Sequence, residues 1–160
     1  MTESPWLGDA CSLVDAFRAK DRSPLEELDA TLGSIEASEL NAFSFIDAEA
    51  ARDRAASADV HLPFGGVPFG VKELSRYRGW PDTEASLVFA DRTAEWTETA
   101  IERAVQLGGV VPVGLTTASE FGGLNVSTTR LNGVTHNPWE HGRTAGGSSG
   151  GSASAVAGGL

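Results

Sequence analysis

Apolar residues recur at helical spacing through the first third of the chain. The clearest helix start is the segment from Ser23 to Glu26, where a capping serine and a glutamate enclose a proline at the first helical position. The apolar residues that share one face after this start are Leu25, Leu28, Leu32 and Ile35. Their spacing predicts a helix over about residues 24–37, and similar patterns favour helices over about residues 11–20 and 47–56.

Short apolar runs typical of strands follow these helices. The expected elements are a helix at Thr97–Leu107, which ends at two glycines, and strands at Asn41–Ile46, Val67–Val71 and Val110–Val113. Pro68 has no amide hydrogen to give to a sheet, so it must lie at a sheet edge or at the start of its strand. The order strand, helix, strand predicts a layered α/β fold.

Charge and cysteine content exclude several classes of protein. The chain has 160 residues, enough for one core, with 22 acidic and 12 basic residues and a formal net charge of -10. This balance offers no basic face for phosphates, so we expect no direct nucleic-acid partner. The single Cys11 and three scattered histidines predict no disulfide, no metal site and no cofactor.

The hydropathy pattern gives no indication of a membrane protein. No apolar run approaches the ~20 residues that span a bilayer. The first residues also lack the basic-then-apolar order of a secretory leader. We therefore expect a cytoplasmic protein without a membrane partner.

The Gly/Ser-rich stretch over residues 144–160 is the most unusual part of the chain. Its composition by itself favours a flexible linker. However, it passes into helix-compatible residues at Ala153–Ala157, and a loop at a helix N-terminus can face an anion or a developing negative charge. It lacks the lysine of a Walker A loop, and its match to G-x-S-x-G lacks the preceding apolar strand. The stretch stops at Leu160 without a terminating turn, which is typical of an interrupted sequence.

Lys72 follows directly after an expected strand and is one of only two lysines in a chain with ten arginines. In the simplest interpretation its stem covers apolar surface while the ammonium group reaches water. A catalytic role is the alternative, because a buried lysine, unlike arginine, can lose its proton and act as a general base. The residues by themselves leave both interpretations open.

Three segments, in order and in spacing, resemble the amidase signature family. They are Gly66–Glu73, Gly114–Phe121 and, after an Asn137-Pro138 turn, Arg143–Ser152. Members of that family hydrolyse amide bonds through an acyl-enzyme, using a triad of serine, cis-serine and lysine. By position, the resemblance implies that Lys72 is the general base and Ser148 the cis-serine that relays the proton. It also suggests Gly146, Gly147 and Ser149 as loop residues near the substrate.

The resemblance carries further expectations about the whole protein. The fold would be the N-terminal part of the amidase signature fold, a mixed sheet flanked by helices. Residues 1–160 would form a single incomplete domain, with N-terminal helices over 1–60 and the start of the catalytic α/β core over 61–160. The family's nucleophilic serine lies in a later Gly-Gly-Ser segment, beyond Leu160, so we expect this chain to be inactive alone. The expected partner is a small-molecule amide, and the helices of residues 10–60 offer a surface for a homodimer.

Two other interpretations remain beside an amidase. One is the A subunit of a tRNA-dependent amidotransferase, which releases ammonia from glutamine with the same triad. The acidic balance, the lack of basic clusters and Leu115, where many members carry lysine, weigh against it. The other is a non-catalytic product, either a remnant or an anion-binding module. Two further departures from the family are Glu73 in place of aspartate and Ala145 in place of proline.

Overall fold

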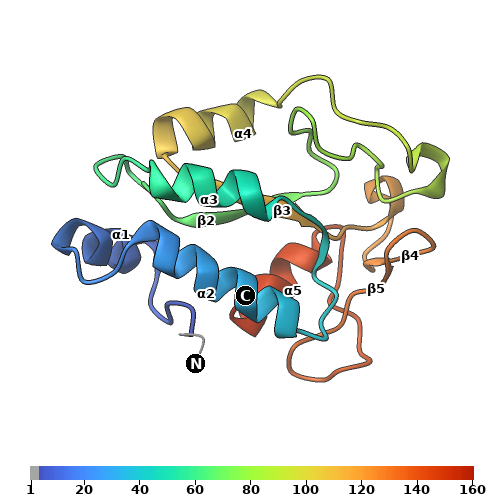
Figure 1. Ribbon diagram of the computed structural model, residues 1–160. Coiled ribbons are helices and arrows are strands. Elements are labelled where there is room, and N and C mark those ends of the chain that lie inside the picture. Colours follow the sequence, from blue (N-terminus) through green and yellow to red (C-terminus); the bar gives the residue numbers. More distant parts are fainter. Residues whose placement is uncertain (1–3) are drawn as a thin grey trace.

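A three-stranded mixed sheet lies at the centre of the computed structural model, which describes residues 4–160. The strand order is β1-β3-β2, with β1 (Phe43–Ile46) antiparallel and β2 (Pro68–Lys72) parallel to β3 (Val111–Thr116). The chain crosses from β2 to β3 through α4 (Thr99–Arg103), so the expected α/β fold is confirmed (Figure 1). Pro68 is the first residue of β2, which is an edge strand of this sheet, as its missing amide hydrogen requires.

The first three helices begin at the capping signals that the sequence contains. They are α1 (Ala10–Ala19), α2 (Pro24–Ala37) and α3 (Ala48–Ala56). At the start of α2, Ser23 Oγ accepts a hydrogen bond from the Glu26 amide, and the Glu26 carboxylate accepts one from the Ser23 amide. Asp9 and Ser12 form the same reciprocal pair at the start of α1, and at α3 the Asp47 side chain accepts a hydrogen bond from the Ala50 amide. All three helix predictions are therefore confirmed.

Buried residues of β3 take part in two clusters of the core. Val113 packs with Leu28 of α2 and Ala51 of α3, and Leu115 packs with Val71 and Trp80 in a second cluster that Ile101 of α4 joins. Successive strand residues point to opposite faces. Thr116 accordingly faces α5 (Gly150–Gly158), which covers the other side of the sheet.

The predicted helix at Thr97–Leu107 is shorter at its start and changes its geometry before it ends. It begins at Thr99, and the five residues after Arg103 form η2 (Ala104–Gly108), a π-helical turn. Gly109 then ends it in the left-handed region, with φ 79°. A Cβ at this position would press on the neighbouring Gly65 backbone and the Leu62 side chain, so only glycine fits there.

Beyond β3 the chain contains short elements that the sequence pattern did not predict. These are η3 (Glu120–Gly122) and a small hairpin of β4 (Thr128–Thr129) and β5 (Gly133–Val134), while η1 (Leu87–Phe89) lies earlier, before α4. The expectation that the last helix lacks a terminating turn is wrong. Gly159, with φ 73°, ends α5 and donates its amide to the Val156 carbonyl. No helix among residues 4–160 has both the length and the apolar character needed to cross a bilayer.

Candidate active site

Lys72 and Ser148, which are 76 positions apart in the chain, meet at the end of the central sheet. Lys72 is the last residue of β2, and its neighbour across the ladder is Thr116 of β3. Its Nζ donates a hydrogen bond to Ser148 Oγ at 2.8 Å, and both residues are half-buried. The amine therefore points into the protein toward a hydroxyl group, and the interpretation of Lys72 as a solvent-facing surface lysine does not describe it.

The loop before α5 has a backbone that its glycines permit. Gly146 has φ 82°, in the left-handed region, and the Gly147–Ser148 peptide bond is cis. A Cβ on Gly147 would lie 2.7 Å from the backbone nitrogen of Val126, so the loop can pass there only with glycine. Ser149 is exposed and caps α5 without a side-chain hydrogen bond.

Hydrogen bonds hold this loop on both sides of Ser148. Ser127 Oγ donates to the Gly146 carbonyl at 3.1 Å and accepts from the Gly150 amide at 3.0 Å. The Ser119 amide, just beyond β3, donates to the Ser148 carbonyl at 3.2 Å. The Gly/Ser stretch is thus an anchored loop and helix, and the linker interpretation is wrong.

The start of α5 is closely packed on the sheet. The Gly151 amide donates to the Thr117 carbonyl at 2.9 Å, and the hydroxyl groups of Thr116 and Ser152 lie 2.7 Å apart. Because the Gly150 and Gly151 amides already have protein acceptors, they are not free to bind an anion. This geometry argues against the anion-binding module and in favour of a fixed support for Ser148.

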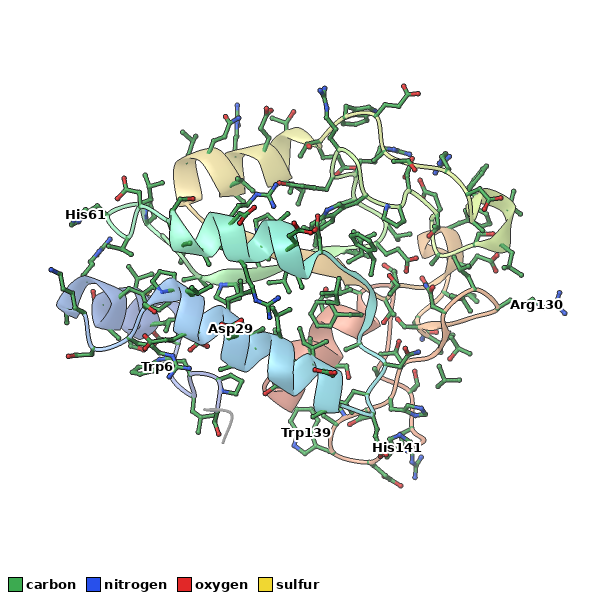
Figure 2. All side chains as sticks on the ribbon, viewed as in Figure 1. Trp6, Asp29, His61, Arg130, Trp139 and His141 are labelled. Atoms are coloured by element: carbon green, nitrogen blue, oxygen red, sulfur yellow. The ribbon has the colours of Figure 1, made fainter. Side chains whose placement is uncertain are left out.

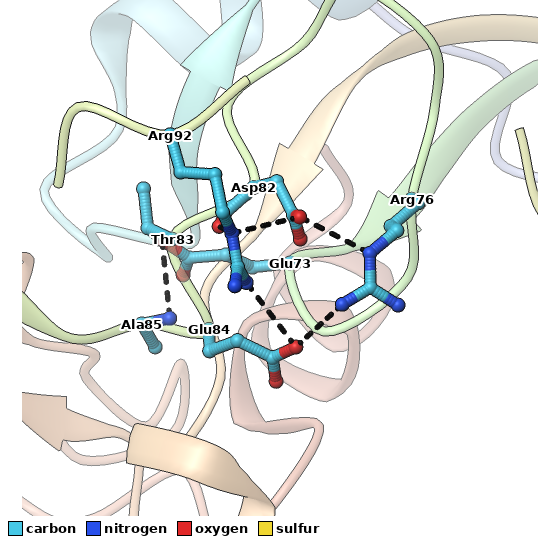
Figure 3. Close-up of polar contacts among 7 residues, drawn as sticks. All are labelled: Glu73, Arg76, Asp82, Thr83, Glu84, Ala85 and Arg92. Carbon is cyan, nitrogen blue, oxygen red and sulfur yellow. Dashed lines mark hydrogen bonds and ion pairs between the residues drawn. The ribbon is translucent and has the colours of Figure 1, made fainter. Parts of the chain in front are cut away.

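The carboxylates near the site have partners other than Lys72. Within residues 4–160, no carboxylate lies at ion-pair distance from the Lys72 amine. Glu73, only 2% exposed, accepts hydrogen bonds from Thr83 and Asn132 instead. Farther out, Asp82 and Glu84 each contact two arginines, Arg76 and Arg92 (Figure 3). The hydrogen bond to Asp82, strengthened by the negative charges nearby, raises the pKa of Arg76, so this guanidinium stays charged.

Sequence reasoning missed three residues that build the site. Ser119 lies inside one of the three recognised segments, so it had a signal but no assigned role. Ser127 and Asn132 lie in a stretch without a pattern, and only the folded chain brings them to the loop or to Glu73. Across the described part of the chain, no three His, Cys, Asp or Glu side chains gather as a metal site requires.

Comparisons with known proteins identify the family of this chain. The amidase family profile matches residues 26–160. The A subunit of the glutamyl-tRNA(Gln) amidotransferase from Cupriavidus pinatubonensis is 37% identical over 155 residues, which are 92% of this chain and 31% of that protein. Its counterpart from Akkermansia muciniphila is 38% identical over 144 residues, 89% of this chain and 30% of that protein. The chain therefore spans less than a third of the length of these two curated relatives.

Two solved enzymes have a similar fold over nearly the whole of this chain. The 6-aminohexanoate cyclic dimer hydrolase superposes with a TM-score of 0.87 at 29% identity, over 94% of this chain and 32% of that chain. A bacterial aryl acylamidase of the amidase signature family superposes with a TM-score of 0.86 at 26% identity, over 95% of this chain and 34% of that chain. The sequence segments, the sheet, the family match and these structures lead to one conclusion: this chain belongs to the amidase signature family.

Proposed function

We propose that this chain supplies the general base and the proton relay of an enzyme that hydrolyses the carbon–nitrogen bond of amides. Membership of the amidase family supports the reaction class. The observation that carries the residue assignment is the 2.8 Å contact between Lys72 Nζ and Ser148 Oγ. A general base must lie within hydrogen-bond reach of the proton it removes, and this separation meets that requirement.

In the proposed mechanism, Ser148 transfers protons between two partners. A neutral Lys72 amine takes the proton of the Ser148 hydroxyl as Ser148 takes the proton of the nucleophilic serine, whose oxygen attacks the amide carbonyl. The resulting ammonium then returns the proton through Ser148 to the leaving nitrogen, and the carbon–nitrogen bond breaks to leave an acyl-enzyme. Water, activated along the same route, releases the acid and regenerates the serine.

The nucleophile of this mechanism does not come from the residues assigned above. In the family it belongs to a later Gly-Gly-Ser segment, so the 160-residue polypeptide is expected to show no turnover by itself. We expect mass spectrometry to detect no acylated serine after incubation of this polypeptide with an activated amide or ester. An acyl-enzyme on it would contradict this part of the proposal.

Substitution of each residue in the product of the full reading frame tests the assignment. Lys72→Ala and Ser148→Ala should each lower kcat for amide hydrolysis by about 10⁴-fold or more, because members of a catalytic triad act as a unit. Lys20 is the only other lysine of this chain, and it is exposed. Lys20→Ala is therefore the control and should leave kcat unchanged. If both site variants keep the wild-type kcat, the relay assignment is wrong.

The A subunit of a glutamyl-tRNA amidotransferase is a second candidate function. Its support is the 37% identity with one such protein. Leu115 is no argument against it, because its side chain is 1% exposed in the core with Val71 and Trp80 and cannot reach a substrate. The net charge of -10 favours a simple amidase, or a subunit that leaves tRNA binding to its partners.

Substrate profiling and purification separate the two candidates. Hydrolysis of simple aliphatic or aromatic amides by a purified single protein would support the amidase. Ammonia release from glutamine, together with co-purification of further subunits that bind tRNA, would support the amidotransferase. No hydrolysis of any of these amides would favour the non-catalytic remnant.

A further inference from the structure

Glu73 is a buried carboxylate that the proposed mechanism does not use. It is 2% exposed, and no basic side chain in the described residues forms an ion pair with it. Each of its oxygens instead has one neutral donor: Thr83 Oγ1 donates to Oε1, and Asn132 Nδ2 donates to Oε2, both at 2.7 Å. Burial of a carboxylate is unfavourable unless hydrogen bonds satisfy it. The two hydrogen bonds therefore allow Glu73 to be buried, and the question is what this buried contact does for the structure.

Glu73 directly follows Lys72, and the two side chains diverge. The Glu73 amide donates to the Thr116 carbonyl at 3.0 Å, so the ladder between β2 and β3 continues through this residue. Successive side chains of an extended strand point to opposite faces. Lys72 therefore reaches the loop of Ser148, while Glu73 reaches Asn132 on another side of the strand end.

Asn132 is itself held firmly in the turn between β4 and β5. Its amide donates to Thr129 Oγ1 at 2.9 Å, and its carbonyl accepts from Asn41 Nδ2 at 2.7 Å. The neighbouring Arg130 is exposed and extends outward at the edge of the molecule (Figure 2). The Asn132 side chain thus connects Glu73 to a hairpin with little freedom to shift.

The same hairpin holds the loop that carries Ser148. At its base, the Thr135 amide donates to the Ser127 carbonyl at 3.0 Å. Ser127 Oγ in turn bonds the backbone at Gly146 and Gly150, one on each side of Ser148. A continuous set of contacts therefore leads from Glu73 through the hairpin to the proposed relay hydroxyl.

The other oxygen of Glu73 is anchored by a rigid segment. Thr83 lies between Asp82 and Glu84, whose carboxylates are held by the guanidinium groups of Arg76 and Arg92 (Figure 3). Thr83 is 5% exposed, and its hydroxyl also accepts the Ala85 amide. The Glu73 carboxylate is thus fixed between this segment and the hairpin.

We propose that Glu73 and Asn132 form a positioning clamp, which keeps the Ser148 loop at hydrogen-bonding distance from the Lys72 amine. Lys72 and Glu73 are consecutive, so any shift of the hairpin relative to β2 changes both contacts. Glu73 and Asn132 are positioning residues, because neither contacts the reacting atoms. The catalytic consequence of the clamp rests on the proposed function, whereas its geometric part can be tested without activity.

A reversed hydrogen bond provides the sharpest test. Asn132→Asp places a second carboxylate against Glu73 Oε2, and the repulsion between them should open the clamp. The double variant Glu73→Gln/Asn132→Asp restores a donor and an acceptor with their roles exchanged. It should therefore close the clamp again.

The two lysines of the chain provide the readout. In protein labelled with ¹³C at lysine Cε, a fixed Lys72 should show two inequivalent Hε resonances, whereas the exposed Lys20 should show one averaged resonance. Asn132→Asp should collapse the Lys72 pair into one averaged signal, and the double variant should restore it. Leu32→Ala, which weakens the distant core beside α2, is the control and should leave the Lys72 pair resolved.

Each outcome of this experiment decides the proposal. A resolved Lys72 pair in folded Asn132→Asp, or a pair that stays averaged in the folded double variant, would overturn the clamp. If Asn132→Asp does not fold, Asn132→Ala takes its place, since it removes the donor without adding charge. In that variant an averaged Lys72 signal supports the clamp, and an unchanged pair refutes it.

Kinetics of the product of the full reading frame separate this inference from the proposed function. Asn132→Ala should lower kcat by up to about 100-fold with little change in KM, because misplacement of a catalytic group impairs the chemical step. If the wild-type protein hydrolyses no amide, the proposed function fails, while the lysine spectra still test the clamp. Wild-type kcat in Asn132→Ala would overturn the catalytic part of the clamp.

Discussion

At the scale of the residue, the proposed function requires a side chain that can hold a proton and release it. Lys72 is placed where its amine bonds a hydroxyl group and meets no carboxylate within residues 4–160. Arginine, the usual cation of this chain, would stay charged at every accessible pH. The proposed role of general base is therefore one that lysine can fill and arginine cannot, although the residues by themselves left a surface lysine as the alternative.

Lys72→Arg tests this point directly. It keeps a positive charge and a long side chain but cannot become a neutral base, so amide hydrolysis should fall about as far as in Lys72→Ala. The measurement is kcat of the full reading-frame product, with Lys20→Arg as the matched control. Activity near the wild-type value in Lys72→Arg would show that the residue acts only as a charge.

Gly151 gives a second test at this scale. A Cβ at this position would overlap the backbone amide of Thr117, so Gly151→Ala must push α5 away from β3. Such overpacking should lower the free energy of unfolding by about 1–3 kcal/mol. Gly123→Ala is the control, because its Cβ would meet nothing closer than 3.8 Å. Its effect in urea denaturation should stay within about 0.5 kcal/mol, and equal losses in both variants would contradict the close approach of α5.

At the scale of the element, neighbouring residues set the start of α2, whereas distant residues set the position of the hairpin β4–β5. The start of α2 follows from residues that are neighbours in the chain, Ser23 and Glu26, and its bounds agree with the prediction. The hairpin β4–β5 has only two residues in each strand and no hydrophobic alternation. Its position depends on Asn41 and Glu73, which bond Asn132 from distant parts of the chain. No local pattern could have predicted it.

The cap of α2 predicts a pH-dependent stability. Hydrogen bonds from the Ser23 side chain and backbone lower the pKa of Glu26 below its ordinary value of 4.5. A lowered carboxyl pKa in the folded state stabilises the protein above the ordinary value, and this contribution disappears as the pH falls through the folded pKa.

Ser23→Ala removes the hydrogen bonds of this cap and should therefore lower stability at neutral pH. The difference from wild type should shrink once the pH falls well below 4.5, where Glu26 is protonated in both proteins. Urea denaturation at the two pH values measures it. A difference that grows in acid would contradict the role of the Glu26 carboxylate.

At the scale of the whole molecule, the sheet brings together segments that are far apart in the chain. The end of β2 supplies Lys72, the turn after β3 supplies the Ser119 amide, and α5 begins beside Ser148. The acidic surface belongs to the same scale. A formal net charge of -10 repels phosphates, so the polypeptide should not shift tRNA in an electrophoretic mobility assay at low salt. Binding that weakens steeply with added salt would instead reveal a local basic site.

The sequence by itself determined the features that depend on neighbouring residues or on the chemistry of a side chain. These include the capped start of α2, the place of Pro68 at a sheet edge or at the start of its strand and, through the family resemblance, the candidates Lys72 and Ser148. The tertiary structure alone decided that the Lys72 amine meets the Ser148 hydroxyl, and that Ser127 and Asn132 support the loop. The physical reason is range: helix caps act within one turn, whereas these contacts join residues many positions apart and form only when the strands, the hairpin and α5 pack together.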